Sequence, residues 1–219
     1  MARAGLTPRK LAEAGAELAD EAGFDSVTMS ELARRAGVKT ASLYAHIANS
    51  EELNVRIAVL ALDELADRGE AAIAGRSGRA ALAALGDVYR DYATEHPGRY
   101  AATRQPLGTT GGADASVLAD AVRAGTRHAR MTRAILRGYD VAETEQTHAV
   151  RLLGSVFHGF VGLELGGAFS RSEPPSAESW ERALTVLDHL LTHWAAATAT
   201  DAATATDTAT DAPPVTDPR

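Results

Sequence analysis

The stretch Thr28–Ile47, "TMSELARRAGVKTASLYAHI", decides how this chain folds. Thr28 and Glu31 form a T-x-x-E capping box, a pattern that typically begins a helix. Gly37 tolerates the left-handed backbone that ends a helix, and a further helix is predicted over 39–47. Two short helices joined by a tight glycine turn are typical of the helix-turn-helix, which places one helix in the DNA major groove.

The residues around this turn agree with two closely crossing helices. Ala33 supplies the small side chain that the crossing needs, and Gly37 follows four positions later. We expect the apolar contacts to come from Leu32, Ala36, Val38 and Leu43, and a third wall from Leu11, Ala14 and Leu18 on an earlier helix. An ordinary three-helix bundle with a solvated polar face remains the alternative.

The exposed face of the 39–47 helix is expected to carry hydroxyl, methyl, phenol and imidazole groups. Such groups can read base edges or bond to phosphates. They belong to Thr40, Ala41, Ser42, Tyr44, Ala45 and His46.

Capping and breaking residues place the remaining helices, and they predict an all-α chain of about nine helices. Thr7-Pro8 begins the first helix, which ends at Gly23, and Asn49 with Glu52 begins a fourth near Ser50 that runs to Ile73. Ser176 is expected to cap the last helix. Later helices are predicted over 79–96, 97–106, 114–137, 144–165 and 176–194, with loops at 107–113 and 166–175 and a disordered low-complexity tail over 195–219.

Composition narrows the class of protein. The chain holds 45% hydrophobic residues, no cysteine and a net charge of −7, and its first 50 residues carry six basic and six acidic side chains. A disulfide framework is therefore excluded, and a local basic face matters more for DNA than the overall sum. Without an 18-residue apolar run or a signal-like start, we expect a cytoplasmic protein with no membrane partner.

The segment "ELARRAGVKTASLYAHIANSEEL" resembles the DNA-binding domain of the TetR family of bacterial repressors (TetR/AcrR type), over about Thr7–Leu53. The marks are the Leu43-Tyr44 pair, His46 and the capped start of the fourth helix. The resemblance implies phosphate contacts from Thr28, Ser30, Tyr44 and His46. It places Thr40, Ala41, Ser42 and Ala45 nearest the bases.

Three positions depart from the family pattern. Ser50 stands where the family usually has a lysine, Lys39 stands where Ser or Thr often caps the recognition helix, and Ile47 replaces a common aromatic residue. We expect Ser50 to remain in the interface and the lost charge to be replaced by Lys39, together with Arg3, Arg9 and Lys10.

"EHPGRYAATRQP" and "GSVFHGFVGLELGGAF" resemble a C-terminal regulatory domain of TetR-type proteins, of the WHG type, which has a His-Gly pair (here His158-Gly159) in its penultimate long helix. The resemblance implies a helical domain that binds a small-molecule effector and a homodimer through the last two long helices. With the low-complexity tail over 195–219, this gives a helix-turn-helix DNA-binding domain over 1–53 and a helical effector-binding and dimerisation domain over 54–194. Candidate effector contacts are Tyr89, Tyr92, Tyr100, Phe157, His158 and Phe160, although aromatic residues at helical spacing are more often plain core.

The residues themselves agree with a dimer. The 144–165 helix is apolar on more than one face, as burial against both its own core and a partner requires. The helix contains three glycines, Gly154, Gly159 and Gly162. Glycine lowers the stability of a helix unless close packing against another helix compensates for that loss, and the second helix can belong to the same chain or to a second copy. The last helix offers Trp180, Leu184, Leu187, Leu190, Leu191 and Trp194 as further contact surface.

Two patterns suggest metal ligands, but neither is complete. Glu145 and His148 form one E-x-x-H, whereas a di-iron bundle needs two such motifs and two more glutamates, and His189 and His193 form a lone i, i+4 pair. We therefore expect no metal and no cofactor.

The function predicted is a ligand-responsive repressor that binds palindromic double-stranded operator DNA as a dimer. An all-α enzyme, for which nucleophile and phosphate-loop motifs are missing, or a dimeric scaffold, is the alternative.

Overall fold

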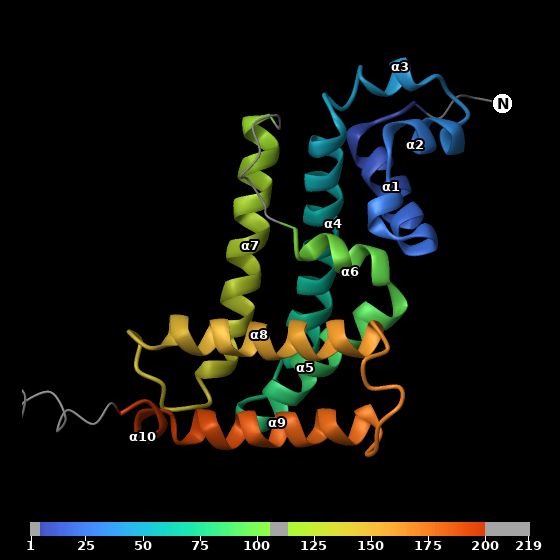
Figure 1. The fold of residues 1–219 in the computed structure, drawn as a ribbon. Coiled ribbons are helices and arrows are strands. Elements are labelled where there is room, and N and C mark those ends of the chain that lie inside the picture. Colours follow the sequence, from blue (N-terminus) through green and yellow to red (C-terminus); the bar gives the residue numbers. More distant parts are fainter. Residues whose placement is uncertain (1–4, 106–113, 200–219) are drawn as a thin grey trace, which may run out of the picture.

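The computed structural model describes residues 5–105 and 114–199, and within these ranges every regular element is helical (Figure 1). This confirms the predicted all-α class. The helices are α1 (Pro8–Ala22), the 3₁₀ turn η1 (Phe24–Ser26), α2 (Met29–Ala36), α3 (Thr40–Leu43), α4 (Ser50–Ile73), α5 (Gly78–Glu95), α6 (Pro97–Thr103), α7 (Ala115–Leu136), α8 (Gln146–Leu165), α9 (Ser176–Thr192) and α10 (Trp194–Thr198).

Local capping begins the first, second and fourth helices where the sequence predicts. The side chains of Thr7 and Thr28 accept hydrogen bonds of 3.2 Å from the backbone N–H groups of Lys10 and Glu31. Asn49 Oδ1 accepts one of 2.8 Å from the N–H of Glu52. Each bond satisfies a backbone donor that the first turn of a helix leaves unpaired, so these starts are determined by neighbouring residues alone.

Two hydrophobic cores share the long helix α4. Figure 1 shows α1–α3 gathered at one end of α4, with α7 beside α4 and with α8 and α9 across its other end. The first core joins α1–α3 to the start of α4, and its largest buried side chains are Leu11, Leu18, Leu32, Leu43, Ile47, Leu53 and Ile57. The second joins α5 to α7, α8 and α9, through residues that include Leu82, Leu85, Tyr89, Leu153, Phe157, Trp180, Leu184 and Leu191.

Several expected boundaries are wrong. α3 ends at Leu43, and 44–46 form a turn, because the chain must bury Ile47 and then bring Asn49 into the extended backbone (φ −162°, ψ 174°) that caps α4. Ser176 is the first residue of α9 and makes no cap. α9 ends at Thr192, and the helix α10 lies over Trp194–Thr198, where the disordered tail was expected to begin.

The predicted loop at 107–113 and the tail from residue 200 lie outside the described residues. Across the described ranges, no helix is both long enough and apolar enough to cross a membrane.

Candidate DNA-binding face and effector region

The helix-turn-helix is held together by a small buried set of side chains. Leu32, Ala33 and Leu43 are at most 2% exposed, and Gly37 ends α2 with the left-handed backbone (φ 66°, ψ 31°). Val38 is half-buried against the same core. Ala36, by contrast, is exposed, so its expected role as a packing contact is wrong: the last residue of α2 lies at the open side of the turn.

None of the predicted DNA-contacting side chains is buried. Thr40 and His46 are half-buried, and the others are exposed, namely Thr28, Ser30, Lys39, Ala41, Ser42, Tyr44, Ala45 and Ser50. Tyr44 is 53% exposed although its neighbours Leu43 and Ile47 are fully buried. These buried neighbours anchor the turn and leave the phenol free to contact a partner.

The arginines that the structure describes in this domain are paired, and Lys39 is not. Arg34 binds Glu31, and Arg35 binds Glu21, whose pKa is lowered by that hydrogen bond. Lys39 has neither a hydrogen bond nor an ion pair with any residue that the structure describes, and it lines a hollow of about 750 Å³ beside the glycine turn. It is therefore a cation on this face that can meet a phosphate without first breaking an ion pair.

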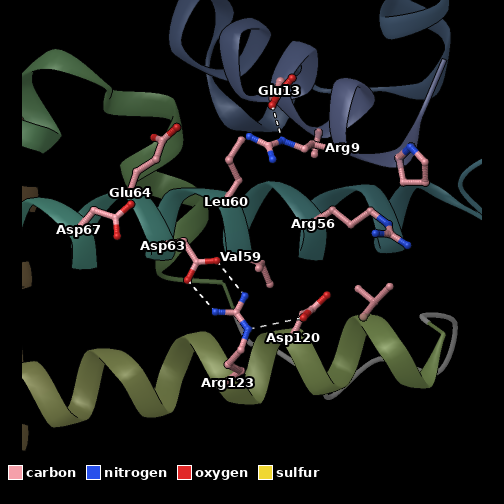
Figure 2. Close-up of a pocket in the computed structure, with 13 residues that line it drawn as sticks. Arg9, Glu13, Arg56, Val59, Leu60, Asp63, Glu64, Asp67, Asp120 and Arg123 are labelled. Atoms are coloured by element: carbon pink, nitrogen blue, oxygen red, sulfur yellow. Dashed lines mark hydrogen bonds and ion pairs between the residues drawn. The ribbon is translucent and has the colours of Figure 1, made fainter. Parts of the chain in front are cut away.

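Two of the other expected cations, Arg9 and Lys10, are bonded to groups of their own chain. Arg9 Nε donates a hydrogen bond of 2.8 Å to Glu13 and lines a cleft beside α4 (Figure 2). Lys10 Nζ donates to the carbonyl of Gly5, and Arg3 lies outside the described residues. The orientation of Arg9 thus argues against its expected phosphate contact.

The first turn of α4 presents backbone donors beside α3. Ser50 is exposed at the first position of this 24-residue helix, whose N-terminus carries a partial positive charge. Glu52 is only 4% exposed; it accepts from the N–H of Ala48 and pairs with Arg56. The Glu52 carboxylate is therefore buried and paired, whereas Ser50 and the N-terminal end of α4 lie at the surface.

The middle helices bring four of the six expected effector contacts together. Tyr89, Tyr100, Phe157 and His158 come from α5, α6 and α8, and the rings of Tyr89 and His158 lie 5.2 Å apart. The Tyr100 hydroxyl lies 2.9 Å from His158 Nδ1. Tyr92 instead donates to Glu64 at 2.8 Å, and Phe160 packs on Trp180 and Phe169, so these two do not join the group.

A histidine that the sequence reasoning missed completes the cluster. His128 of α7 pairs through Nε2 with the Tyr89 hydroxyl, and its buried Nδ1 has no hydrogen-bond partner among the described residues. Burial lowers the pKa values of His128 and His158 to about 4, so both rings are neutral at pH 7. The phenol pKa values of Tyr89 and Tyr100 are raised by burial. The region therefore presents neutral phenol and imidazole groups, with the Arg104 guanidinium 5.7 Å from the centre of the Tyr100 ring.

A second hollow, which the sequence does not predict, lies between α1, α4 and α7 (Figure 2). It measures about 610 Å³, and Arg123 of α7 binds Asp63 of α4 across its floor at 2.9 Å. Its carboxylates are already paired with arginines, as Glu13 is with Arg9 and Glu64 with Arg99.

The last two long helices bury most of their apolar residues against their own core. Trp180, Leu184, Leu187, Leu191 and Trp194 of α9 and α10 are at most 6% exposed, so the expectation that they form contact surface is wrong. The large apolar side chains that stay exposed on these helices are Leu163 and Leu165 on α8, 54% and 43%, and Val186 on α9, 58%. A Cβ added at Gly154 or Gly159 would meet no atom of the described residues within 4 Å, so no close approach within this part of the chain explains these glycines.

Taken together, a helix-turn-helix with an exposed reading face and a helical domain attached through α4 define a class: DNA-binding transcription regulators with a separate regulatory domain. Comparisons with known proteins give the family. Residues 11–56 match the model of bacterial regulatory proteins of the tetR family, and residues 82–187 match the tetracyclin repressor-like C-terminal domain. The chain belongs to the TetR family of transcription regulators, which are not enzymes.

Relatives and solved structures agree. The uncharacterized HTH-type transcriptional regulator YobS of Bacillus subtilis (strain 168) is 30% identical over 171 residues, covering 78% of this chain and 85% of YobS. The uncharacterized HTH-type transcriptional regulator Rv0681 of Mycobacterium tuberculosis is 34% identical, covering 74% and 72%. The fold is similar to that of apo ActR from Streptomyces coelicolor, with a TM-score of 0.63, 16% identity, and coverage of 91% of this chain and all of ActR (100%).

Proposed function

We propose that this protein is a repressor that binds a palindromic operator as a homodimer and is released by a small-molecule effector. The observation that carries the proposal is the reading face itself. Its ten predicted contact residues, Thr28 to Ser50, all remain at least partly exposed around a buried framework. Exposed polar residues on a rigid scaffold are typical of a binding surface.

Each protomer has one such face, and a palindrome needs two. In a two-fold dimer, the two α3 segments would read half-sites one helical turn apart, about 34–36 Å. The outward glycines of α8, together with Leu163 and Val186, supply a surface on which a second copy can pack closely. We therefore place the dimer contact on α8 and α9.

The Tyr89, Tyr100, His128 and His158 cluster is the proposed effector region. A ligand there must bind the released state better than the DNA-bound state, because equal affinity for both shifts nothing. We propose that it changes the spacing of the two reading faces through α4, which belongs to both cores.

Fluorescence anisotropy tests DNA binding directly, with a labelled duplex taken from upstream of the protein's own gene and a scrambled duplex of the same composition. We expect binding at physiological salt to the first duplex only. Equal binding to both, or to neither, would contradict the proposal.

Lys39→Ala tests the phosphate contact. Each phosphate contact contributes about one unit to the slope of log affinity against log salt, so that slope should fall by about one. Arg76→Ala is the matched control, because Arg76 is an exposed cation just beyond the far end of α4. An unchanged slope for Lys39→Ala, or an equal loss in both variants, would remove Lys39 from the interface.

A further inference from the structure

The proposed effector region contains a cation that no acid neutralises. Arg104, at the C-terminal end of α6, makes neither an ion pair nor a side-chain hydrogen bond with any residue that the structure describes. Its guanidinium carbon lies 5.7 Å from the centre of the Tyr100 ring. Burial and, after it, the charge of Arg104 lower the pKa of His158, so the guanidinium acts on the cluster itself.

Gly162 of α8 makes room for this guanidinium. It lies four positions after His158 on the same helix, so both residues belong to one face of α8. A Cβ added to Gly162 would lie 3.2 Å from Arg104 Nη1, which is closer than such atoms normally approach. The missing side chain at this position therefore lets the guanidinium lie directly against α8, beside His158.

The acids of the surrounding helices are already bound. The sequence of α6 has no acidic residue, and the one acid of α8, Glu164, accepts hydrogen bonds of 2.8 and 2.7 Å from Arg90. On α4, Glu64 beside the region is paired with Arg99. Among the described residues of α6, α8 and the ring cluster, a positive charge thus remains without a free carboxylate to balance it.

A series of ring contacts leads from Arg104 into the protein. The ring centres of Tyr100 and His158 lie 5.5 Å apart, those of His158 and Tyr89 5.2 Å, and those of Tyr89 and His128 5.5 Å. The buried Nδ1 of His128, at the inner end of the series, has no hydrogen-bond partner among the described residues. An unpaired buried polar atom is unfavourable, and a ligand that bonds to it removes that cost.

The region therefore has a cation at its exposed end, apolar ring faces behind it and an unpaired nitrogen at its inner end. We propose that the effector is an organic carboxylate with an apolar body, whose charged group binds Arg104 and whose body lies against Tyr100 and Tyr89. The inference rests on the proposed function, because it names the class of ligand for the same region. A guanidinium forms two parallel hydrogen bonds with a carboxylate, and a neutral ligand cannot replace their charge. An ammonium ligand would meet the charge of Arg104 and find no free acid.

Isothermal titration calorimetry of the full chain, without DNA, tests the class of ligand. The probes are benzoate, 1-naphthoate and octanoate, each compared with its neutral amide, so that the two members of a pair differ only in the charged group. At least one carboxylate should bind roughly 10- to 150-fold more tightly than its amide, the effect of hydrogen bonds to a charged group. If none of the three carboxylates binds, or if each binds no better than its amide, the proposal is overturned.

Arg104 variants test whether this residue recognises the charge. Arg104→Gln should remove most of the preference for the carboxylate and leave the affinity for the amide nearly unchanged. Arg104→Lys keeps the charge but loses the planar fork, so part of the preference should remain. A preference that survives Arg104→Gln, or an equal loss of affinity for both members of the pair, would overturn the proposal.

Two controls accompany these variants. Arg76→Gln removes another exposed cation, just beyond the far end of α4, and should change neither affinity. Because Arg104 is exposed and has no partner in the described chain, its variants should unfold at the same temperature as the wild type. An equal loss of carboxylate binding in Arg76→Gln would show a general effect of net charge and overturn the role of Arg104.

Release of DNA keeps the two proposals apart. In fluorescence anisotropy, the carboxylate that binds should release the upstream duplex at a lower concentration than its amide does. If the wild type binds no upstream DNA, the proposed function fails, and calorimetry still decides the class of ligand. If the wild type binds that DNA and each amide releases it as well as its carboxylate, only the class of ligand is wrong.

Discussion

Replacing Gly159 by alanine should have opposite effects on the folding of one protomer and on its association. Gly159 lies inside α8, is exposed, and leaves open space for a Cβ within 4 Å. Alanine is favoured over glycine in a helix interior by about 0.8–1.0 kcal/mol. For a chain of this size, that gain raises the Tm by roughly 2–4 °C.

In a dimer that packs closely on this face of α8, the added methyl group meets the partner. Overpacking costs about 1–3 kcal/mol, which corresponds to a rise of roughly 5- to 150-fold in the dissociation constant of the dimer. The variant should therefore be more stable as a monomer and weaker as a dimer.

Sedimentation equilibrium and thermal unfolding over a range of protein concentrations measure the two effects separately. Gly125→Ala is the matched control, because Gly125 lies inside α7 and a Cβ there also meets nothing within 4 Å. It should raise the Tm equally and leave the dimer unchanged. If Gly159→Ala behaves like this control, α8 is not a closely packed dimer contact, and the reasoning about its outward glycines is refuted.

Three further predictions concern stability and DNA affinity. The pKa values of His128 and His158 are about 4 in the folded protein and 6.5 in the unfolded chain, so the unfolded state binds more protons at pH values between the two. The free energy of unfolding, measured in urea, should therefore fall on the order of 1–2 kcal/mol per histidine from pH 7 to pH 5. His128→Gln should make this fall smaller. A Cβ added to Gly98 would lie 2.0 Å from the carbonyl of Ala19, so Gly98→Ala should destabilise the protein by about 3 kcal/mol or separate α6 from α1, seen as faster hydrogen–deuterium exchange at 19–26, and unchanged stability would contradict this backbone contact. Tyr44→Ala should weaken operator binding in anisotropy while changing unfolding free energy by less than about 0.5 kcal/mol, because the ring is over half exposed.

Features determined by neighbouring residues were predictable from the sequence. The starts of α1, α2 and α4 depend on a side chain and an N–H three residues apart, as at Thr28 and Glu31. The glycine turn at Gly37 depends on a single backbone angle. The extent of α3 was not predictable in this way, since it is limited by the need to bury Ile47 and still reach Asn49.

Features determined by packing between distant segments were not predictable. Helical periodicity groups Trp180, Leu184, Leu187 and Leu191 on one face of α9, but it does not say whether their own chain or a partner covers that face. The structure buries all four within the protomer and leaves Val186 outside. The hydrogen bond from the backbone N–H of Arg99 to Asp20 joins residues 79 positions apart and has no local signature.

The effector region shows why candidate residues can be proposed from sequence but must be selected in three dimensions. Tyr89 and Tyr92 are three positions apart on α5, a rise of about 4.5 Å along the helix axis. That step places Tyr89 against His128 and His158, and Tyr92 against Glu64 of α4. One turn of α5 therefore separates a residue of the proposed effector region from a residue that bonds to α4.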